Sequence, residues 1–292
     1  MAKDAVETDT SLSAFRDFKP PFLGKFLFHF FPIRRSVVLS NMRIVFGNRL
    51  SGEELRDLAQ RFYGHFALCL WENLFLGWLK DEEVRRKLQV INAHHVFEAS
   101  AKGKGIIFMT GHFGNWELAA ISSSLQFPDY RGRFHVIRRP LVNKFIERIA
   151  FGRFYRAGIT VIPKKNSAHQ VLEWLGRNDI VIFIMDQYAK PGRDGVEVEF
   201  FGRKTGTFKS LALVARTSGA VVIPMVSYRL SDGKHVMEFY DPLDWMEGHD
   251  SDEEILKNTR HYNQVLERMV LEHPDQWLWF HRRWKVKGGR RR

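Results

Sequence analysis

One histidine and one glutamate, His112 and Glu117, have the types and the spacing that general-base chemistry needs. The apolar run Ile106–Met109 ends shortly before His112, and the pattern from Trp116 onward is helical. On a single helix this spacing would turn the two side chains roughly 140° apart, but the turn at Gly114 lets them converge. A carboxylate beside a histidine fixes its tautomer and stabilises the imidazolium that forms when it takes a proton. The alternative is that neither residue is catalytic: His112 would then only end a strand, and Glu117 would occupy a helix N-terminus, where the helix dipole favours a carboxylate.

Apolar strands alternate with amphipathic helices through the chain after residue 90. Strands that are apolar throughout indicate a mainly parallel sheet with helices on both faces. We therefore expect an α/β fold with a mainly parallel central sheet flanked by helices, formed by residues 91–292 as one globular unit. Residues 1–90 would hold a polar tail, an interfacial segment and helices. The expected strands are Ile106–Met109, Phe134–Ile137, Ile159–Ile162, Ile180–Met185, Val221–Ser227 and Val236–Phe239. The expected helices are Trp116–Leu125, Leu141–Tyr155, Ser167–Arg177, Phe208–Ser218 and Glu253–Leu271.

Charged residues follow several of these strands, at the sheet edge where open α/β folds bind ligands. Arg138 and Arg139 follow the second strand, Lys164-Lys165 follow the third, and Asp186 and Gln187 follow the fourth. With the histidine after the first strand, they would form a cationic pocket that contains a proton acceptor. Arginines hold anions by forked hydrogen bonds, and a carboxylate that ends an apolar strand needs a partner to offset its desolvation. The alternatives are a solvated strand end for the arginines and a turn-initiating role for the aspartate.

Several other kinds of site are excluded or weakly indicated. The residues Phe200–Lys209 are expected to form a basic, glycine-containing loop that leads into a helix and suits an anion, with Lys209 as a candidate contact. The chain lacks a phosphate-binding Walker loop, a His-Glu-x-x-His zinc pair, a dinucleotide-binding fingerprint and a serine nucleophile elbow. Its single cysteine, Cys69, excludes an intramolecular disulfide and a cysteine-built metal site. A base without an enzyme nucleophile favours direct attack by a substrate hydroxyl or by water.

Charge and aromatic content point to a polyanionic or membrane partner. The formal net charge is +12, the sequence pI is about 9.8, and 14% of the residues are aromatic. Basic and aromatic residues together are typical of proteins at bilayer interfaces, and no nucleic-acid recognition motif occurs. The segment Phe22–Phe31 is too short to span a bilayer, which takes about 20 residues, so it either lies among lipid headgroups or packs on the globular domain. A helix expected over Ser51–Leu79 ends in the nearly all-apolar stretch Phe66–Leu79, which is buried or touches lipid.

A set of ordered motifs resembles those of one known family. Gly111–Glu117 reads Gly-His-x-Gly-Asn-Trp-Glu, Arg139-Pro140 follows the next strand, and Asp186-Gln187 follows the fourth. Pro274–Lys285 is similar to the family pattern Pro-Glu-Gln-Tyr-x-Trp-x-His-Arg-Arg-Phe-Lys. The chain is thereby similar to the late, or secondary, acyltransferases of lipid A biosynthesis. These belong to the lysophospholipid-acyltransferase-like superfamily, which is marked by a histidine and an acid separated by four residues, the HX4E motif.

The resemblance implies a glycerol-phosphate-acyltransferase-like fold and transfer of a fatty acyl chain from acyl-carrier protein to a hydroxyl of a lipid A precursor. It implies no metal and no bound cofactor. His112 would deprotonate the acceptor hydroxyl and Glu117 would orient His112. Arg139 would stabilise negative charge in a site that Asp186 helps to organise. Further substrate contacts are expected at Asn115, Arg138, Gln187 and Lys209.

The implied partners are acyl-carrier protein as the donor, an anionic glycolipid as the acceptor, and the inner-membrane surface. The expected location is the cytoplasmic face of the bacterial inner membrane. Because the N-terminal apolar segment is shorter than is usual in the family, we expect peripheral attachment or a short N-terminal anchor. One alternative is an acyltransferase for another glycolipid, aminolipid or lysophospholipid acceptor, with acyl-coenzyme A as a further possible donor. A second alternative is a catalytically silent homologue that binds lipid or carrier protein.

Overall fold

The computed structural model describes residues 21–138, 152–163 and 167–285. The chain divides into two compact units that alternate along the sequence. Of the described residues, 21–68, 186–209 and 259–285 belong to the first unit, and the remaining ones, within 69–185 and 210–258, belong to the second. These units are groupings of residues in space, and the division expected at residue 90 stays a prediction.

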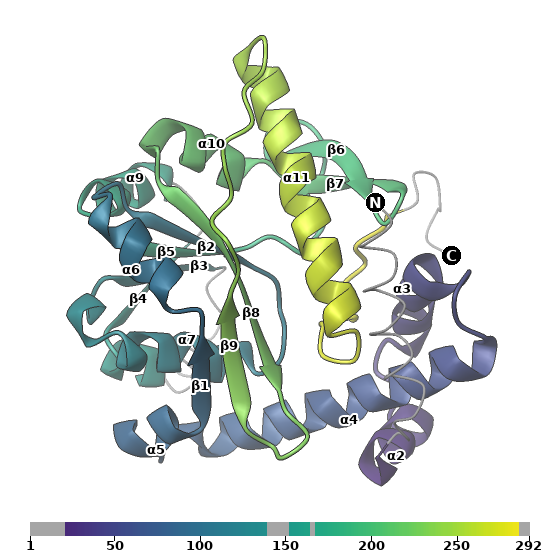
Figure 1. The fold of residues 1–292 in the computed structure, drawn as a ribbon. Coiled ribbons are helices and arrows are strands. Elements are labelled where there is room, and N and C mark those ends of the chain that lie inside the picture. Colours follow the sequence, from purple (N-terminus) through teal and green to yellow (C-terminus); the bar gives the residue numbers. More distant parts are fainter. Residues whose placement is uncertain (1–20, 139–151, 164–166, 286–292) are drawn as a thin grey trace. The chain divides into compact units, whose positions relative to one another are not determined.

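A seven-stranded sheet forms the centre of the second unit (Figure 1). In spatial order its strands are β1 (Leu88–Ile91), β9 (His235–Phe239), β8 (Val221–Arg229), β2 (Ile106–Thr110), β5 (Ile180–Ile184), β3 (Phe134–Arg138) and β4 (Ile159–Pro163). Every neighbouring pair is parallel except β8 and β9, which are antiparallel. The mixed α/β class and the mainly parallel sheet are therefore confirmed. All six expected strands occur, and β1 adds a short edge strand that was not expected.

Helices flank this sheet. They are α5 (Asp81–Arg86), α6 (His94–Ala101), α7 (Trp116–Gln126), the short 3-10 helix η1 (Pro128–Tyr130), α9 (Ala168–Gly176) and α10 (Ser210–Ser218). On one face, Phe108, Val136 and Ile182 share a hydrophobic cluster with residues of α5, α6 and α7. On the opposite face, His135 of β3 stacks on Trp174 of α9 with ring centroids 3.7 Å apart. In Figure 1, α9 and α10 lie above the strands and α5 and α7 lie below them.

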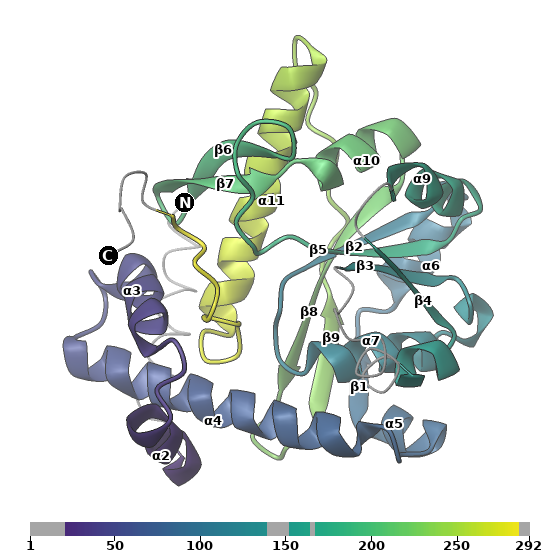
Figure 2. The same cartoon turned by 180° about the vertical axis from the view of Figure 1, so that it is seen from behind.

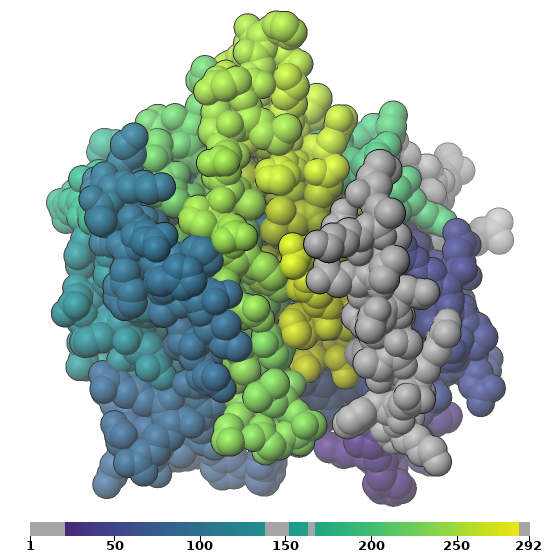
Figure 3. All heavy atoms as spheres, in the orientation of Figure 1, coloured from purple at the N-terminus to yellow at the C-terminus, as the bar shows by residue number. Residues whose placement is uncertain are grey.

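β1 is an edge strand of the seven-stranded sheet. The space-filling view shows the blue segment around β1 against the green β8–β9 pair, as expected from the pairing of β1 with β9 (Figure 3). Residues 152–156 are helical, and most of the helix expected over Leu141–Tyr155 lies outside the described residues.

The first unit combines helices with a two-stranded hairpin. Its elements are α2 (Phe22–Phe30), α3 (Arg35–Phe46), β6 (Gly195–Phe200) and β7 (Arg203–Phe208), while α4 (Gly52–Leu76) and α11 (Ser251–Glu272) contribute residues to both units. Phe201 and Gly202 join the two strands with positive φ angles of 52° and 67°. In Figure 1 and Figure 2 the hairpin lies beside α11, and the Phe201 N–H donates to Glu267 Oε1 at 2.6 Å. The prediction of a loop over Phe200–Lys209 was wrong, because these residues form the hairpin turn and a strand that pairs with β6.

A buried arginine joins this hairpin to the C-terminal part of the described chain. Arg283 is fully buried and donates to the carbonyl of Gly206 at 2.8 Å and to Thr207 Oγ1 at 2.6 Å. Burial lowers the pKa of Arg283 to about 10, while the charges of Asp186 and Glu267 work in the opposite direction. A buried guanidinium needs such partners to offset the loss of water.

The helix α2 packs against α4 and keeps an aromatic face exposed. Only glycine fits at Gly24, because a Cβ atom there would lie 2.1 Å from the carbonyl oxygen of Gln60. Phe28 is buried on the same side, whereas Phe22 and Phe30 are 83% and 70% exposed. The segment therefore packs on the protein and also presents apolar surface to the outside. Among the described residues, no helix is both long enough and apolar enough to cross a membrane.

Candidate active site

The loop between β2 and α7 carries His112 and is fixed by its neighbours. Gly114 has a φ of 55°, and a Cβ atom there would lie 2.5 Å from the carbonyl oxygen of Ser227 in β8, so the position requires glycine. Ser227 Oγ donates to the carbonyl of Phe113 at 2.8 Å. The side-chain oxygen of Asn115 accepts the backbone N–H three residues later at 3.1 Å and caps α7. The residues that follow His112 are therefore held by β8 and by the start of the helix.

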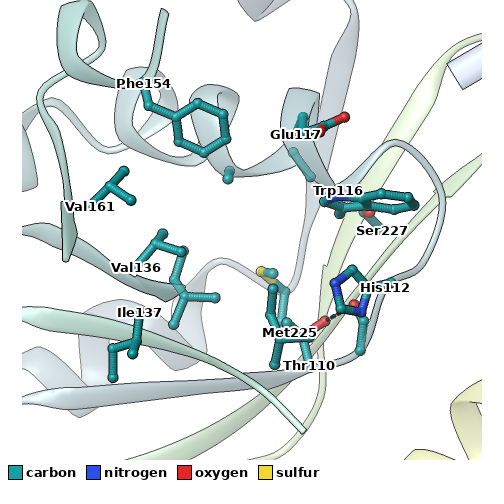
Figure 4. A pocket seen from close by; sticks show the side chains of 15 residues that line it. Thr110, His112, Trp116, Glu117, Val136, Ile137, Phe154, Val161, Met225 and Ser227 are labelled. Carbon is teal, nitrogen blue, oxygen red and sulfur yellow. Dashed lines mark hydrogen bonds between the residues drawn. The ribbon is translucent and has the colours of Figure 1, made fainter. Parts of the chain in front are cut away.

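His112 and Glu117 both line a cavity of about 240 Å³ within the second unit. Figure 4 shows His112 and Trp116 at one end of this cavity and the apolar side chains of Val136 and Phe154 at the other. The ring of Trp116 meets the ring of His112 edge-on, with centroids 5.2 Å apart. Other lining residues are Ala119, Ala120, Val161, Ile182 and Met225. Ionisable groups at one end and apolar walls elsewhere suit a ligand with one reactive polar group on a hydrocarbon body.

Glu117 lies in the first turn of α7, where the helix dipole favours a carboxylate. Asn73 of α4 donates a hydrogen bond from Nδ2 to Glu117 Oε2. Burial raises the pKa of Glu117, and the charge on a protonated His112 works in the opposite direction. The ionised carboxylate and the imidazolium therefore stabilise each other. A general base needs this coupling, because the imidazole becomes charged when it accepts a proton.

Glu72, also on α4, is the centre of a charged cluster. Its carboxylate accepts hydrogen bonds from Arg229 at 2.6 and 2.7 Å and from Asn115 Nδ2 at 2.9 Å. His235 Nε2 lies 3.1 Å from the same carboxylate. Burial opposes ionisation, yet the hydrogen bonds from His235, Arg229 and Asn115 hold the pKa of Glu72 far below its usual range. Two consecutive residues of α4 therefore contact the cap of α7 and its first-turn carboxylate.

The structure describes only part of the expected cationic edge. Arg138 is the last residue of β3, and Ile137 beside it lines the cavity. Arg139, Lys164 and Lys165 lie outside the described residues. The roles expected for the two arginines therefore stay predictions.

Three further expected contacts, Asp186, Gln187 and Lys209, belong to the first unit. Asp186 is buried, and its carboxylate accepts the indole N–H of Trp277 at 3.0 Å. Gln187 Nε2 lies 3.1 Å from His281 Nε2. Lys209 directly precedes α10. Substrate contacts at these three residues stay predictions.

The sequence patterns did not identify the Glu72 cluster. One signal was present, because Glu72 is the only charged residue in the apolar stretch Phe66–Leu79, and a charge in such a helix requires a partner. The partners Arg229 and His235 stand 157 and 163 positions further along the chain, so no spacing rule points to them. In the part of the chain that the structure describes, no three histidine, cysteine, aspartate or glutamate side chains are grouped to hold a metal ion.

Comparison with known proteins identifies relatives over most of the chain. Residues 13–286 match the family model described as bacterial lipid A biosynthesis acyltransferase. The chain is 25% identical to the lipid A biosynthesis lauroyltransferase of Escherichia coli (strain K12), over 91% of this chain and 83% of that protein. It is 24% identical to the lipid A biosynthesis palmitoleoyltransferase of the same strain, over 87% and 79%. A phosphatidylinositol mannoside acyltransferase of Mycolicibacterium smegmatis (strain ATCC 700084 / mc(2)155) is 25% identical, over 66% and 62%.

Proposed function

We propose a specific acyl-transfer reaction from the premise that this chain belongs to the bacterial lipid A biosynthesis acyltransferase family and is an acyltransferase. In this reaction a fatty acyl chain moves from the thioester of acyl-carrier protein to a hydroxyl of a lipid A precursor. The observation that carries the proposal is the position of His112 and Glu117 on one cavity whose other walls are mainly apolar. The names of the lauroyl- and palmitoleoyltransferase relatives support lipid A as the acceptor.

His112 acts as the general base of the proposed reaction. Its imidazole accepts the proton of the acceptor hydroxyl while the hydroxyl oxygen forms a bond to the thioester carbonyl carbon. The tetrahedral intermediate then collapses, the carbon–sulfur bond breaks, and the departing sulfur takes the proton from the imidazolium. The products are an ester and a free thiol. Glu117 stabilises the imidazolium between the two proton transfers, and Arg139 is the proposed partner of the negative oxygen.

The apolar part of the cavity holds the acyl chain. Ala120, Val136, Phe154 and Val161 line it, and burial of each methylene group contributes about 0.8 kcal/mol. A chain that fills the space without overfilling it gains most from this burial, because close-packed walls resist extra volume. The walls therefore select the length of the transferred chain.

Glu72 and Asn73 are positioning residues in this proposal. Neither donates nor accepts the transferred proton. Through Asn115, the Glu72 carboxylate supports the cap of α7, and Asn73 donates to Glu117. Reacting groups must be held to within about 0.5 Å of their productive geometry, so these contacts bear directly on the rate.

We further propose that the enzyme works at the cytoplasmic face of the inner membrane, attached peripherally. Trp71 and Leu74 on α4 and Trp78 just beyond it are 61%, 65% and 76% exposed, and the aromatic face of α2 is exposed in the first unit. Aromatic surface combined with a net charge of +12 suits an anionic bilayer surface. A glycerol-phosphate-acyltransferase-like fold with residues 1–90 as a membrane-associating extension belongs to the same proposal. Cosedimentation of the full chain with anionic and with neutral vesicles tests this proposal. We expect the protein to bind the anionic vesicles, and a failure to bind either kind of vesicle would contradict it.

A second acceptor class has an observation in its favour. Phosphatidylinositol mannoside acyltransferases are among the relatives, which supports a phosphorylated glycolipid other than lipid A as an alternative acceptor. The same general-base step applies, because the reacting group is again a hydroxyl. Acyl-coenzyme A is the alternative donor, since it presents the same thioester.

Mass spectrometry of lipid A from cells with and without the gene tests the substrate. We expect deletion to remove one acyl chain, the wild-type gene to restore it, and His112→Ala to fail to restore it. His169→Ala, which alters an exposed histidine of α9, is the matched control and should restore the chain. An unchanged lipid A profile would contradict the lipid A assignment and favour the second acceptor class. Restoration of the acyl chain by His112→Ala would contradict the catalytic mechanism but would not contradict the assignment of lipid A as the substrate.

A further inference from the structure

A second cavity, of about 420 Å³, lies in the first unit and contains none of the residues with a proposed catalytic role. Three segments that are distant in the sequence form it: α3, the start of β7, and the last described residues of the chain. Its volume falls within the range of small-molecule sites, about 300–1,000 Å³. The lining residues are Ser40, Arg43, Ile44, Arg203, Lys204, Trp284 and Lys285.

The lining of this cavity is strongly cationic. Arg43, Arg203, Lys204 and Lys285 all contribute, and no carboxylate does. None of the ion pairs among the described residues involves these four side chains. Glu199 stands opposite Lys204 in the hairpin register but does not line the cavity. Four like charges around one space repel each other unless an anion lies between them.

Neighbouring contacts hold the walls of the cavity in place. The indole N–H of Trp284 donates to the carbonyl of Phe200 at 3.0 Å, and the two rings stack with centroids 5.4 Å apart. Thr205 Oγ1 donates to the carbonyl of Arg283 at 2.7 Å, which joins β7 to the segment that carries Trp284. A site whose walls are fixed before binding loses less entropy when its ligand arrives.

We propose that this cavity binds the phosphate monoester group of an organic ligand. The guanidinium groups of Arg43 and Arg203 each match two phosphate oxygens with parallel N–H donors, and the two lysines add point charges. A phosphate monoester carries nearly two negative charges at neutral pH, so it neutralises more of the charge of four cations than a carboxylate does. Trp284 offers an apolar ring to the organic part of the ligand, and Ser40 adds a hydroxyl. A soluble sugar phosphate and a phospholipid headgroup share this chemistry.

Calorimetric titration of the full chain with glucose 1-phosphate, and with glucose as the phosphate-free companion, tests the proposal. We expect glucose 1-phosphate to bind and glucose not to bind. The double variant Arg43→Gln/Arg203→Gln should weaken binding about tenfold or more, because it removes two charge-assisted contacts. The matched double variant Arg56→Gln/Arg260→Gln removes the same charge from exposed positions outside the cavity and should bind as the wild type does. Equal thermal unfolding midpoints for both variants and the wild type establish that the fold is intact.

Vesicles that contain phosphatidic acid distinguish the two sources of the phosphate. If glucose 1-phosphate does not bind the wild type but Arg43→Gln/Arg203→Gln weakens binding to these vesicles, the cavity holds a lipid headgroup. The reverse result assigns it to a soluble ligand, and both results support a phosphate site. Three results would overturn the proposal. The first is an equal loss of phosphate-probe binding in the cavity variant and in the control variant. The others are binding of polyglutamate as tight as that of the phosphate probes, and no binding of either phosphate probe. These readouts do not depend on acyl transfer, so failure here and failure of the proposed enzyme reaction are separable.

Discussion

Replacing Glu72 by glutamine removes one charge from the cluster at the end of α4 and keeps the shape of the side chain. The Glu72 and Arg229 side chains are 24% and 12% exposed, so the pair is largely shielded from water. Neutralising one partner of a buried pair costs about 3–5 kcal/mol, because the other charge is left uncompensated. Since water reaches this pair in part, we expect the lower figure, about 3 kcal/mol. That is a large share of the ~5–15 kcal/mol that typically stabilises a folded protein.

The pKa of Glu72 defines the pH range of this effect. Burial acts against ionisation, but the hydrogen bonds from His235, Arg229 and Asn115 depress the folded-state pKa well below the ordinary value of 4.5. A depressed carboxyl pKa gives stability that is present above the unfolded-state pKa and is lost as the pH falls below it. The difference between wild type and Glu72→Gln should therefore be full at pH 7 and should shrink as the pH falls below about 4.5.

Urea unfolding followed by tryptophan fluorescence measures the free energy of unfolding, and kcat with purified protein measures the effect on the site. The matched control is Glu82→Gln, because Glu82 pairs with Arg86 at 3.2 Å while their side chains are 61% and 78% exposed. Exposed pairs contribute little, so this variant should resemble the wild type in both measurements. Glu72→Gln should also lower kcat by about tenfold or more, since small displacements of reacting groups are costly. Equal stability of the two variants would refute the energetic reasoning, and full kcat in a destabilised Glu72→Gln would refute the positioning role.

The two remaining predictions concern the acyl cavity and the pH dependence of stability. Ala120 lines the cavity, so Ala120→Phe should shift kcat/KM toward shorter acyl donors, whereas Ala101→Phe, at an exposed position of α6, should not; equal shifts would contradict the assignment of the acyl chain to this space. Burial lowers the pKa of His273 to about 4, with the charge of Glu272 opposing, so its stabilising contribution is complete above about pH 6.5 and is lost as the pH falls toward 4. The wild type should therefore lose up to about 3 kcal/mol of unfolding free energy between these pH values through His273, and His273→Asn should not show this loss. Urea titrations at each pH measure the unfolding free energy. An equal dependence of that free energy on pH in the variant and the wild type would contradict the prediction.

Burial explains which elements the sequence predicts. β2 and β5 are covered on both faces, so their residues are almost wholly apolar and their position follows directly from composition. β6 and β7 are different, because Glu197 and Glu199 are exposed and β7 begins with the exposed residues Arg203 and Lys204. Locally this pattern equals that of a solvated basic loop. Only the partner strand, which the local sequence does not reveal, makes it a hairpin.

In the candidate site too, some contacts could be predicted from the local sequence and others could not. His112 and Glu117 are close in the chain and separated by a glycine turn, so the sequence spacing allows their side chains to converge, and both line the same cavity. The contacts of Glu72 join residues between 43 and 163 positions apart. Such contacts are products of the sheet order, which periodicity does not specify. The lone charge in an apolar helix shows that a partner exists but does not identify it.

The position of Arg283 in the chain has a consequence for the order in which the protein takes shape during synthesis. Arg283 supplies hydrogen bonds to Thr207 and Asn263, both of which precede it in the sequence. Every strand of the seven-stranded sheet is complete by Phe239. A ribosome makes the N-terminal parts first. All strands of the sheet have therefore been made before Arg283, which donates to the hydroxyl of Thr207, is added to the chain. The hydrogen bonds among Thr207, Asn263 and Arg283, in the first unit, are therefore completed only after all seven strands of the sheet have been made.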